Sequence, residues 1–155
     1  GSSISRVSSS GVLSDPWGQV NSPRAVAVDD QGNVYAIAAG NVARFQPDGS
    51  VETGWAVLDP MAGATSIAID VNRNVYTANQ SQGSISKITP QGGVTQNWAA
   101  LGVWPADIAV DGNGNLYTVI SSENSVSRVT PDGTVTTTWA KLAQSASPSA
   151  AMRNS

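Results

Sequence analysis

The fold of this chain is decided by the stretch DIAVDGNGNLYTVI, residues 107–120, because close variants of it occur twice more. They read AVAVDDQGNVYAIA at 25–38 and SIAIDVNRNVYTAN at 66–79. The aspartates and tyrosines of the three copies stand at a constant spacing of 41 residues. A fixed period of this length indicates an array of one small structural unit copied in tandem.

Each copy begins with β-branched residues alternating with small ones, as in Ala25-Val26-Ala27-Val28, and this composition is typical of a packed β-strand. A Gly- and Asn-rich turn follows, and a second apolar run starts at the residue before the tyrosine. Each copy therefore predicts two short antiparallel strands, which we call the inner half of the unit.

A second pattern, the outer half, occurs four times. Apolar residues alternate with Ser or Ala and then with a basic residue, which is the period-2 pattern of a half-buried strand. A turn follows, containing Pro and Gly in three of the copies. A fourth strand then ends on a tryptophan. The four strands that open these outer halves are Ile4-Ser5-Arg6-Val7, Val42-Ala43-Arg44-Phe45, Ile85-Ser86-Lys87-Ile88 and Val126-Ser127-Arg128-Val129.

Four short antiparallel strands repeated every 41 residues predict an all-β fold, a β-propeller built of four-stranded blades. The units resemble those of NHL-repeat and streptogramin-lyase-like propellers over nearly all of residues 4–148. The resemblance implies the propeller fold. Streptogramin-lyase-like propellers use a catalytic histidine and a divalent metal, and this chain contains no histidine, so that activity does not carry over. We therefore expect a protein that is not an enzyme and has no cofactor.

The units divide the chain unevenly. The ranges are an outer half at 4–20, three whole blades at 23–59, 64–101 and 105–142, and the start of a further inner strand or a tail at 147–155.

Three and a half blades form an open arc, and an open arc exposes sheet faces and strand edges. We expect the chain to associate with itself, most simply as two arcs that form one ring of about seven blades. A fragment of a longer polypeptide, an engineered sequence and a closed four-bladed monomer are the alternatives.

The composition narrows the classes of function. A net charge of −3 provides no basic surface for nucleic acid, and no apolar run is long enough to span a membrane. Cysteine and histidine are absent, which excludes disulfides, thiolate metal sites and Ser-His-Asp triads. Low charge without cysteine favours a secreted or cell-surface protein of bacterial type.

The turns after the inner strands are weak candidates for a metal site. Asp111, Asn113 and the equivalent Asp70 carry side-chain oxygens at alternating positions, as calcium loops do. No acidic residue follows at the distance that would close such a loop. Asp and Asn also bond to their own backbone in turns, and we favour that interpretation.

The tryptophans are the candidates for ligand contact. Trp17, Trp55, Trp98 and Trp139 recur once per outer half, where they fill the space between blades or stack on sugars. Trp104 has no counterpart in the other units and lies in a connection between blades, where loops commonly carry function.

The sequence thus predicts a propeller module that assembles into a ring and serves as a scaffold or binding platform for a protein or a glycan. A lectin using the repeated tryptophans is the first alternative. A remnant of a propeller lyase or hydrolase is the second.

Overall fold

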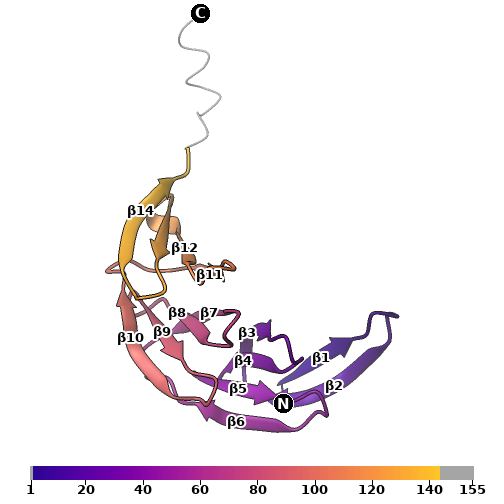
Figure 1. The fold of residues 1–155 in the computed structure, drawn as a ribbon. Coiled ribbons are helices and arrows are strands. Elements are labelled where there is room, and N and C mark those ends of the chain that lie inside the picture. Colours follow the sequence, from indigo (N-terminus) through magenta and orange to yellow (C-terminus); the bar gives the residue numbers. More distant parts are fainter. Residues whose placement is uncertain (1, 144–155) are drawn as a thin grey trace, which may run out of the picture.

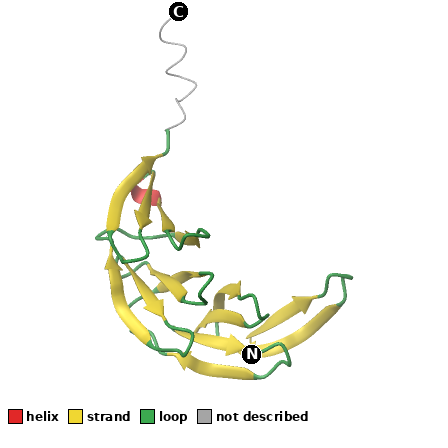
Figure 2. Cartoon of the chain, in the orientation of Figure 1, coloured by secondary structure: helices red, strands yellow, loops and turns green. Residues whose placement is uncertain are grey.

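The computed structural model describes residues 2–143, and these residues form β-strands joined by short turns (Figure 2). Within this range the one helical element is the 3-10 turn Ser121–Glu123. No helix in the described part of the chain is long and apolar enough to cross a membrane. The predicted all-β fold is confirmed.

The strands form one two-stranded sheet and three four-stranded sheets, and every pairing is antiparallel. The half-blade consists of β1 (Ser2–Val7) and β2 (Leu13–Val20). Blade 1 consists of β3 (Pro23–Val28), β4 (Val34–Ala38), β5 (Asn41–Phe45) and β6 (Val51–Ala56). Blade 2 consists of β7 (Ala64–Ile69), β8 (Val75–Asn79), β9 (Ser84–Ile88) and β10 (Val94–Ala100). Blade 3 consists of β11 (Asp107–Val110), β12 (Leu116–Ile120), β13 (Ser125–Val129) and β14 (Val135–Lys141).

Each sheet follows the order of the chain from its inner to its outer strand, as in a propeller blade. The sheets follow one another along a crescent, with β3, β7 and β11 on its concave side and the last strand of each sheet on its convex rim (Figure 1). The structure thus shows an incomplete propeller. The predicted segment 147–155 lies outside the described residues.

Alternation along the strands gives each sheet two packed faces. In blade 1, Tyr35, Ile37 and Val42 are at most 2% exposed and share a cluster with residues of blade 2. Ala43 and Phe45, on the opposite face, share a cluster with Val20 of the half-blade. The core is therefore a series of layers between consecutive sheets rather than one central core.

One position in these layers shows how neighbouring sheets fit by volume. At three of the tryptophans, the following residue lies in the same packed layer as the residue that closes the third strand of the next blade. The pairs are Gly18 with Phe45, Ala56 with Ile88, and Ala99 with Val129. The smallest residue, glycine, is paired with the largest, phenylalanine. The half-blade interface therefore shows the strongest case of a small residue packing opposite a large one. A Cβ atom at Gly18 would lie 2.5 Å from the Cδ1 atom of the Phe45 ring.

We expect Gly18→Ala to lower the free energy of unfolding by about 1–3 kcal/mol, because the added methyl group overpacks a filled site. Combining it with Phe45→Ile, which recreates the pair found between blades 1 and 2, should recover part of this loss. A double-mutant cycle by urea denaturation measures the coupling. Simple addition of the two single effects would contradict the packing rule.

Candidate functional site

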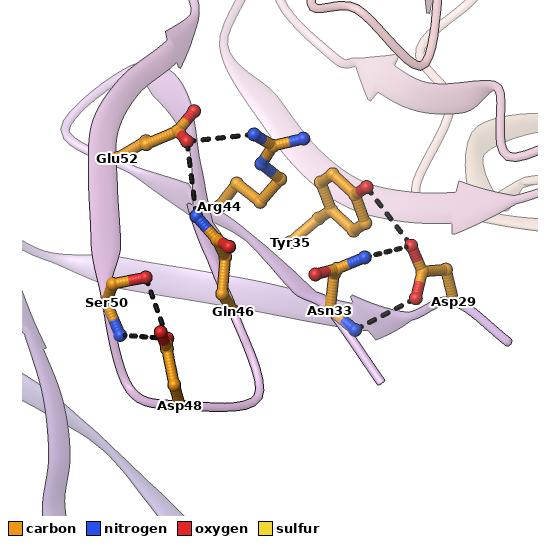
Figure 3. Close-up of polar contacts among 8 residues, drawn as sticks. All are labelled: Asp29, Asn33, Tyr35, Arg44, Gln46, Asp48, Ser50 and Glu52. Carbon is orange, nitrogen blue, oxygen red and sulfur yellow. Dashed lines mark hydrogen bonds and ion pairs between the residues drawn. The ribbon is translucent and has the colours of Figure 1, made fainter. Parts of the chain in front are cut away.

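The turn after each inner strand is closed by an aspartate that accepts hydrogen bonds from its own hairpin. In blade 1, Asp29 Oδ1 accepts the backbone N–H groups of Gln31 and Asn33, both at 2.9 Å. Asp29 Oδ2 accepts the Asn33 side-chain amide at 2.8 Å and the Tyr35 hydroxyl at 3.2 Å (Figure 3). Burial acts to raise the pKa of Asp29, but the hydrogen bonds from Asn33, Gln31 and Tyr35 outweigh it and hold the pKa below its usual value.

The same arrangement, which we call the aspartate clasp, recurs at the candidate metal turns. Asp70 and Asp111 accept from their own turns in the same way. Asn113 donates its backbone N–H, rather than its side-chain amide, to Asp111. Donors therefore surround both carboxylates. Within residues 2–143 no group of three acidic residues gathers at a point that could hold a metal ion.

Each tryptophan of a complete blade packs at a steep angle against the tyrosine of the same blade, with the ring planes 52–62° apart. The ring centroids lie 4.8 Å apart for Trp55 and Tyr35, 5.4 Å for Trp98 and Tyr76, and 5.2 Å for Trp139 and Tyr117. A cation covers the indole in two blades: Arg44 lies 5.7 Å from the ring centroid of Trp55, and Lys87 lies 5.2 Å from that of Trp98. Trp17 stacks differently, on Phe45 of the next sheet at 5.6 Å.

The turn of the following blade closes over most of these tryptophans. A Cβ atom at Gly133 would lie 3.4 Å from the ring of Trp98, and one at Gly92 would lie 2.6 Å from the carbonyl oxygen of Trp55. Trp17, Trp55 and Trp98 are accordingly half-buried. Trp139 has no following blade among the described residues and is 50% exposed.

The C-terminal end of the arc exposes residues whose equivalents inside the arc are buried. Leu142 is 54% exposed, whereas the equivalent Leu58 and Leu101 are 2% and 5% exposed. Val119 is 38% exposed, whereas Ile37 at the same position is 1% exposed. We call the surface of Tyr117, Val119, Trp139 and Leu142 the tail face.

The N-terminal end shows the reverse surface. Val7 is 65% exposed, although its equivalents Phe45, Ile88 and Val129 are fully buried. Leu13 beside it is 60% exposed, and the space around the Cβ position of the turn glycine Gly11 is open. We call the surface of Val7, Gly11 and Leu13 the head face. It presents the residue types that cover a tail-type face inside the arc.

Trp104 lies apart from both faces. Its side chain is 66% exposed and lines an open hollow with Gln80 and Ser81. From the sequence we named this residue and the four repeated tryptophans, and we expected an open arc to expose sheet faces, but we did not identify the residues of the two end faces. Their signal was present, because Val7 and Leu142 match positions that a complete array would bury.

No family model matches the sequence, and no curated protein matches it. Solved structures do match the fold. A catalytically inactive virginiamycin B lyase from Staphylococcus aureus, solved with quinupristin, has a TM-score of 0.73 at 16% identity, covering 91% of this chain and 49% of that chain. A gluconolactonase from Xanthomonas campestris, XC5397, has a TM-score of 0.64 at 19% identity, covering 86% and 53%. A chain of a nidogen/laminin complex has a TM-score of 0.64 at 19% identity, covering 76% and 48%.

These likenesses confirm the resemblance to streptogramin-lyase-like propellers at the level of the fold. The chain spans about half the length of the structures it matches. They also correct one expectation. The prediction that the protein is not an enzyme is wrong, because proteins with this fold include enzymes such as the lyase and the gluconolactonase. The reason is that absent histidine excludes one residue type, whereas the propeller accommodates many kinds of catalytic group.

The aspartate clasp makes the fold sensitive to acid. Because the pKa of Asp29 is lowered in the folded state, its contribution to stability is present above the pKa of the unfolded chain. That contribution is lost as the pH falls through the folded-state pKa. We expect the melting temperature to fall below about pH 4, near the usual aspartate pKa. Asp29→Asn should be less stable at pH 7 and should show a shallower fall.

Asp30→Asn is the matched control for this experiment, since it removes an exposed neighbouring charge and reports the effect of net charge alone. Melting curves between pH 2.5 and 7 measure all three proteins. An unchanged acid slope in Asp29→Asn would show that the clasp does not contribute to acid sensitivity.

Proposed function

We propose that this chain is a half-propeller that completes its ring by head-to-tail association with a second copy, and that the closed ring serves as a binding platform. The observation that carries the proposal is the match between the two ends of the arc. No blade among residues 2–143 covers the tail face of one copy, and the head face of another copy carries the covering residue types.

The interfaces inside the chain indicate how this joint would pack. Between blades 2 and 3, Ala99 and Val129 share a cluster, and the turn glycine Gly133 lies against Trp98. In the joint, Ala140 and Trp139 of one copy take the places of Ala99 and Trp98. Val7 and Gly11 of the other copy take the places of Val129 and Gly133. The joint would thus continue an interface that the chain already forms at three places.

Hydrophobic burial favours this association. Covering a large apolar side chain stabilises by about 1.5–3 kcal/mol, and at least four such side chains are exposed at each joint. They are Val7, Leu13, Trp139 and Leu142. Two arcs that close into a ring form two joints, one more than an open pair of arcs, so closure adds to the stability of the proposed dimer.

Light scattering after gel filtration tests the proposal. We expect about twice the chain mass of 15.9 kDa. Val7→Arg and Leu142→Arg should each weaken association at least tenfold, because each would bury an unpaired charge. Both positions are exposed in the single arc, so the fold itself should remain intact by circular dichroism. Met61→Arg, at a position that is 75% exposed and belongs to neither end face, is the control.

Mixing the two variants distinguishes a head-to-tail joint from a symmetric one. A mixture of Val7→Arg and Leu142→Arg can form one joint free of both substitutions, so it should associate more strongly than either variant alone. A compact monomer of the unaltered chain at all concentrations would overturn the proposal. A mass that grows without limit would overturn the closed ring.

Glycan binding at Trp104 is a second candidate function. The repeated tryptophans pack against other aromatic rings, whereas Trp104 presents 66% of its surface beside an amide and a hydroxyl. A glycan array should then give hits that Trp104→Ala abolishes and Trp139→Ala retains. An array without hits would remove this candidate.

A further inference from the structure

The turn between β11 and β12 in blade 3 contains the only Asn-Gly pair in the sequence, Asn113-Gly114. Asn113 is exposed, and its backbone N–H donates to Asp111 Oδ1 at 2.9 Å. Its side-chain amide does not take part in that bond. The amide is therefore accessible to water, and the next backbone nitrogen belongs to a residue without a side chain.

The three inner hairpins hold this part of their turns in the same way. The residue three positions after each clasp aspartate donates its backbone N–H to the carbonyl oxygen of that aspartate, at 2.9–3.1 Å. The donating residue has a positive φ in every copy, between 63° and 81°. It follows an exposed amide residue each time, in the pairs Gln31-Gly32, Asn72-Arg73 and Asn113-Gly114. The turns thus share one backbone conformation and differ in their side chains.

An asparagine side chain can react with the backbone nitrogen that follows it. In this turn the Gly114 nitrogen would attack Cγ of Asn113 and form a new C–N bond. The Cγ–Nδ2 bond breaks, and the side-chain nitrogen leaves as ammonia with the proton of the Gly114 N–H. Water then opens the resulting succinimide ring. Cleavage at the side-chain carbonyl gives aspartate, and cleavage at the main-chain carbonyl gives isoaspartate, whose main chain runs through Cβ and Cγ.

The side chains of the other turns disfavour this reaction. Arg73 carries a Cβ atom that crowds the approach of its nitrogen to Asn72, whereas a glycine does not. Gln31 precedes a glycine, but its longer side chain would have to close a larger ring. Asn115 is 8% exposed and its side-chain amide donates to Asp111 Oδ2 at 2.9 Å. Asn113 is therefore the reactive amide among the three turns.

We propose that Asn113 is a modification site, at which the chain converts asparagine to aspartate and isoaspartate without an enzyme, and that the aspartate clasp controls the rate. Asp111 Oδ1 accepts the N–H groups of Asn113 and Asn115, and the Asp111 carbonyl accepts that of Gly114 at 3.0 Å. The Gly114 nitrogen must leave this bond before it can reach Cγ, so the reaction proceeds from the open turn. The site does not depend on ring closure.

The two products affect the clasp differently. Aspartate leaves the main chain unchanged and adds one negative charge to the turn. Isoaspartate lengthens the main chain between the two N–H groups that Asp111 Oδ1 accepts, those of residues 113 and 115. The carboxylate can then no longer hold both groups in their present geometry. Isoaspartate formation therefore opens the turn irreversibly.

Peptide mass spectrometry after incubation of the folded protein at about pH 8.5 and 37 °C tests the site. Conversion adds about 1 Da, which distinguishes it from the isomerisation of Asp-Gly pairs such as Asp132-Gly133. We expect Asn113 to react at least about tenfold faster than Asn72 or Gln31. Equal rates at Asn113 and Asn72, or an unchanged mass at Asn113, would overturn the proposal.

Arg73→Gly provides a matched variant that creates a second Asn-Gly pair on the same backbone. The φ of Arg73 is 63°, a conformation that glycine adopts without strain, so the fold should remain intact. Asn72 should then react at a rate close to that of Asn113. Asn113→Gln in the same background should abolish conversion in blade 3 and leave that in blade 2. An Asn72 that stays inert in Arg73→Gly would overturn the chemical basis of the proposal.

Control by the clasp has its own measurement. Asp111→Ala should speed the conversion of Asn113 at least about threefold, whereas Asp132→Ala, in the outer turn of the same blade, should leave it unchanged. The unaltered chain in urea, where the turn is open, sets the upper limit of the rate, and this comparison does not require the variant to fold. Equal rates in the folded and the urea-unfolded chain would overturn control by the clasp.

The effect of the products can be measured on aged protein. The isoaspartyl form, separated by ion-exchange chromatography, should melt at a lower temperature than fresh protein. Asn113→Asp, which reproduces the other product, should melt close to the unaltered chain. An isoaspartyl form that melts with the fresh protein would contradict the opening of the turn.

Discussion

The structure depends on one interaction: the packing of apolar side chains between neighbouring sheets, on both faces of each sheet inside the arc. The sheets carry apolar side chains on both faces, so each face gains stability when a neighbouring sheet covers it. Inside the arc this packing is present, and Val42, Ile85 and Ile88 are fully buried. At the two ends of the described chain one face lacks it, and residues at equivalent positions are 38–65% exposed.

The repeat predicted much of the fold because its signal is local. Strand alternation, the turn glycines and the spacing of the tryptophans each lie within a few residues, and the four-stranded sheets follow from them. The burial of a residue in the arc cannot be predicted from the local signal, because it depends on which sheet comes next. Trp98 and Trp139 stand in the same motif, yet only Trp98 is covered by a following turn.

Other features could not be predicted from the sequence because they depend on which side chains meet across two sheets. The contact of Gly18 with Phe45 joins residues from two sheets and is visible only in the packed structure. The contact between Arg6 and Trp17, 5.8 Å from the guanidinium carbon to the ring centroid, likewise joins two strands whose pairing the sequence does not state. The candidate metal turns illustrate the opposite limit. Their oxygen-rich pattern was visible in the sequence, but the donors that engage Asp70 and Asp111 come from the hairpin geometry.

The curvature of the arc determines which residues lie together on its concave side. The concave side of the arc carries Ala25, Ser66 and Asp107 at equivalent positions of the three inner strands, and Ser66 donates a hydrogen bond to Asp107 across the blades at 2.5 Å. An arc surrounds its axis only in part, so a substrate placed there would remain open to water on one side. If two copies close the ring as proposed, each of these positions appears twice around a common axis. A site at that axis would then be a property of the assembly, built from residues that neither copy can bring together alone.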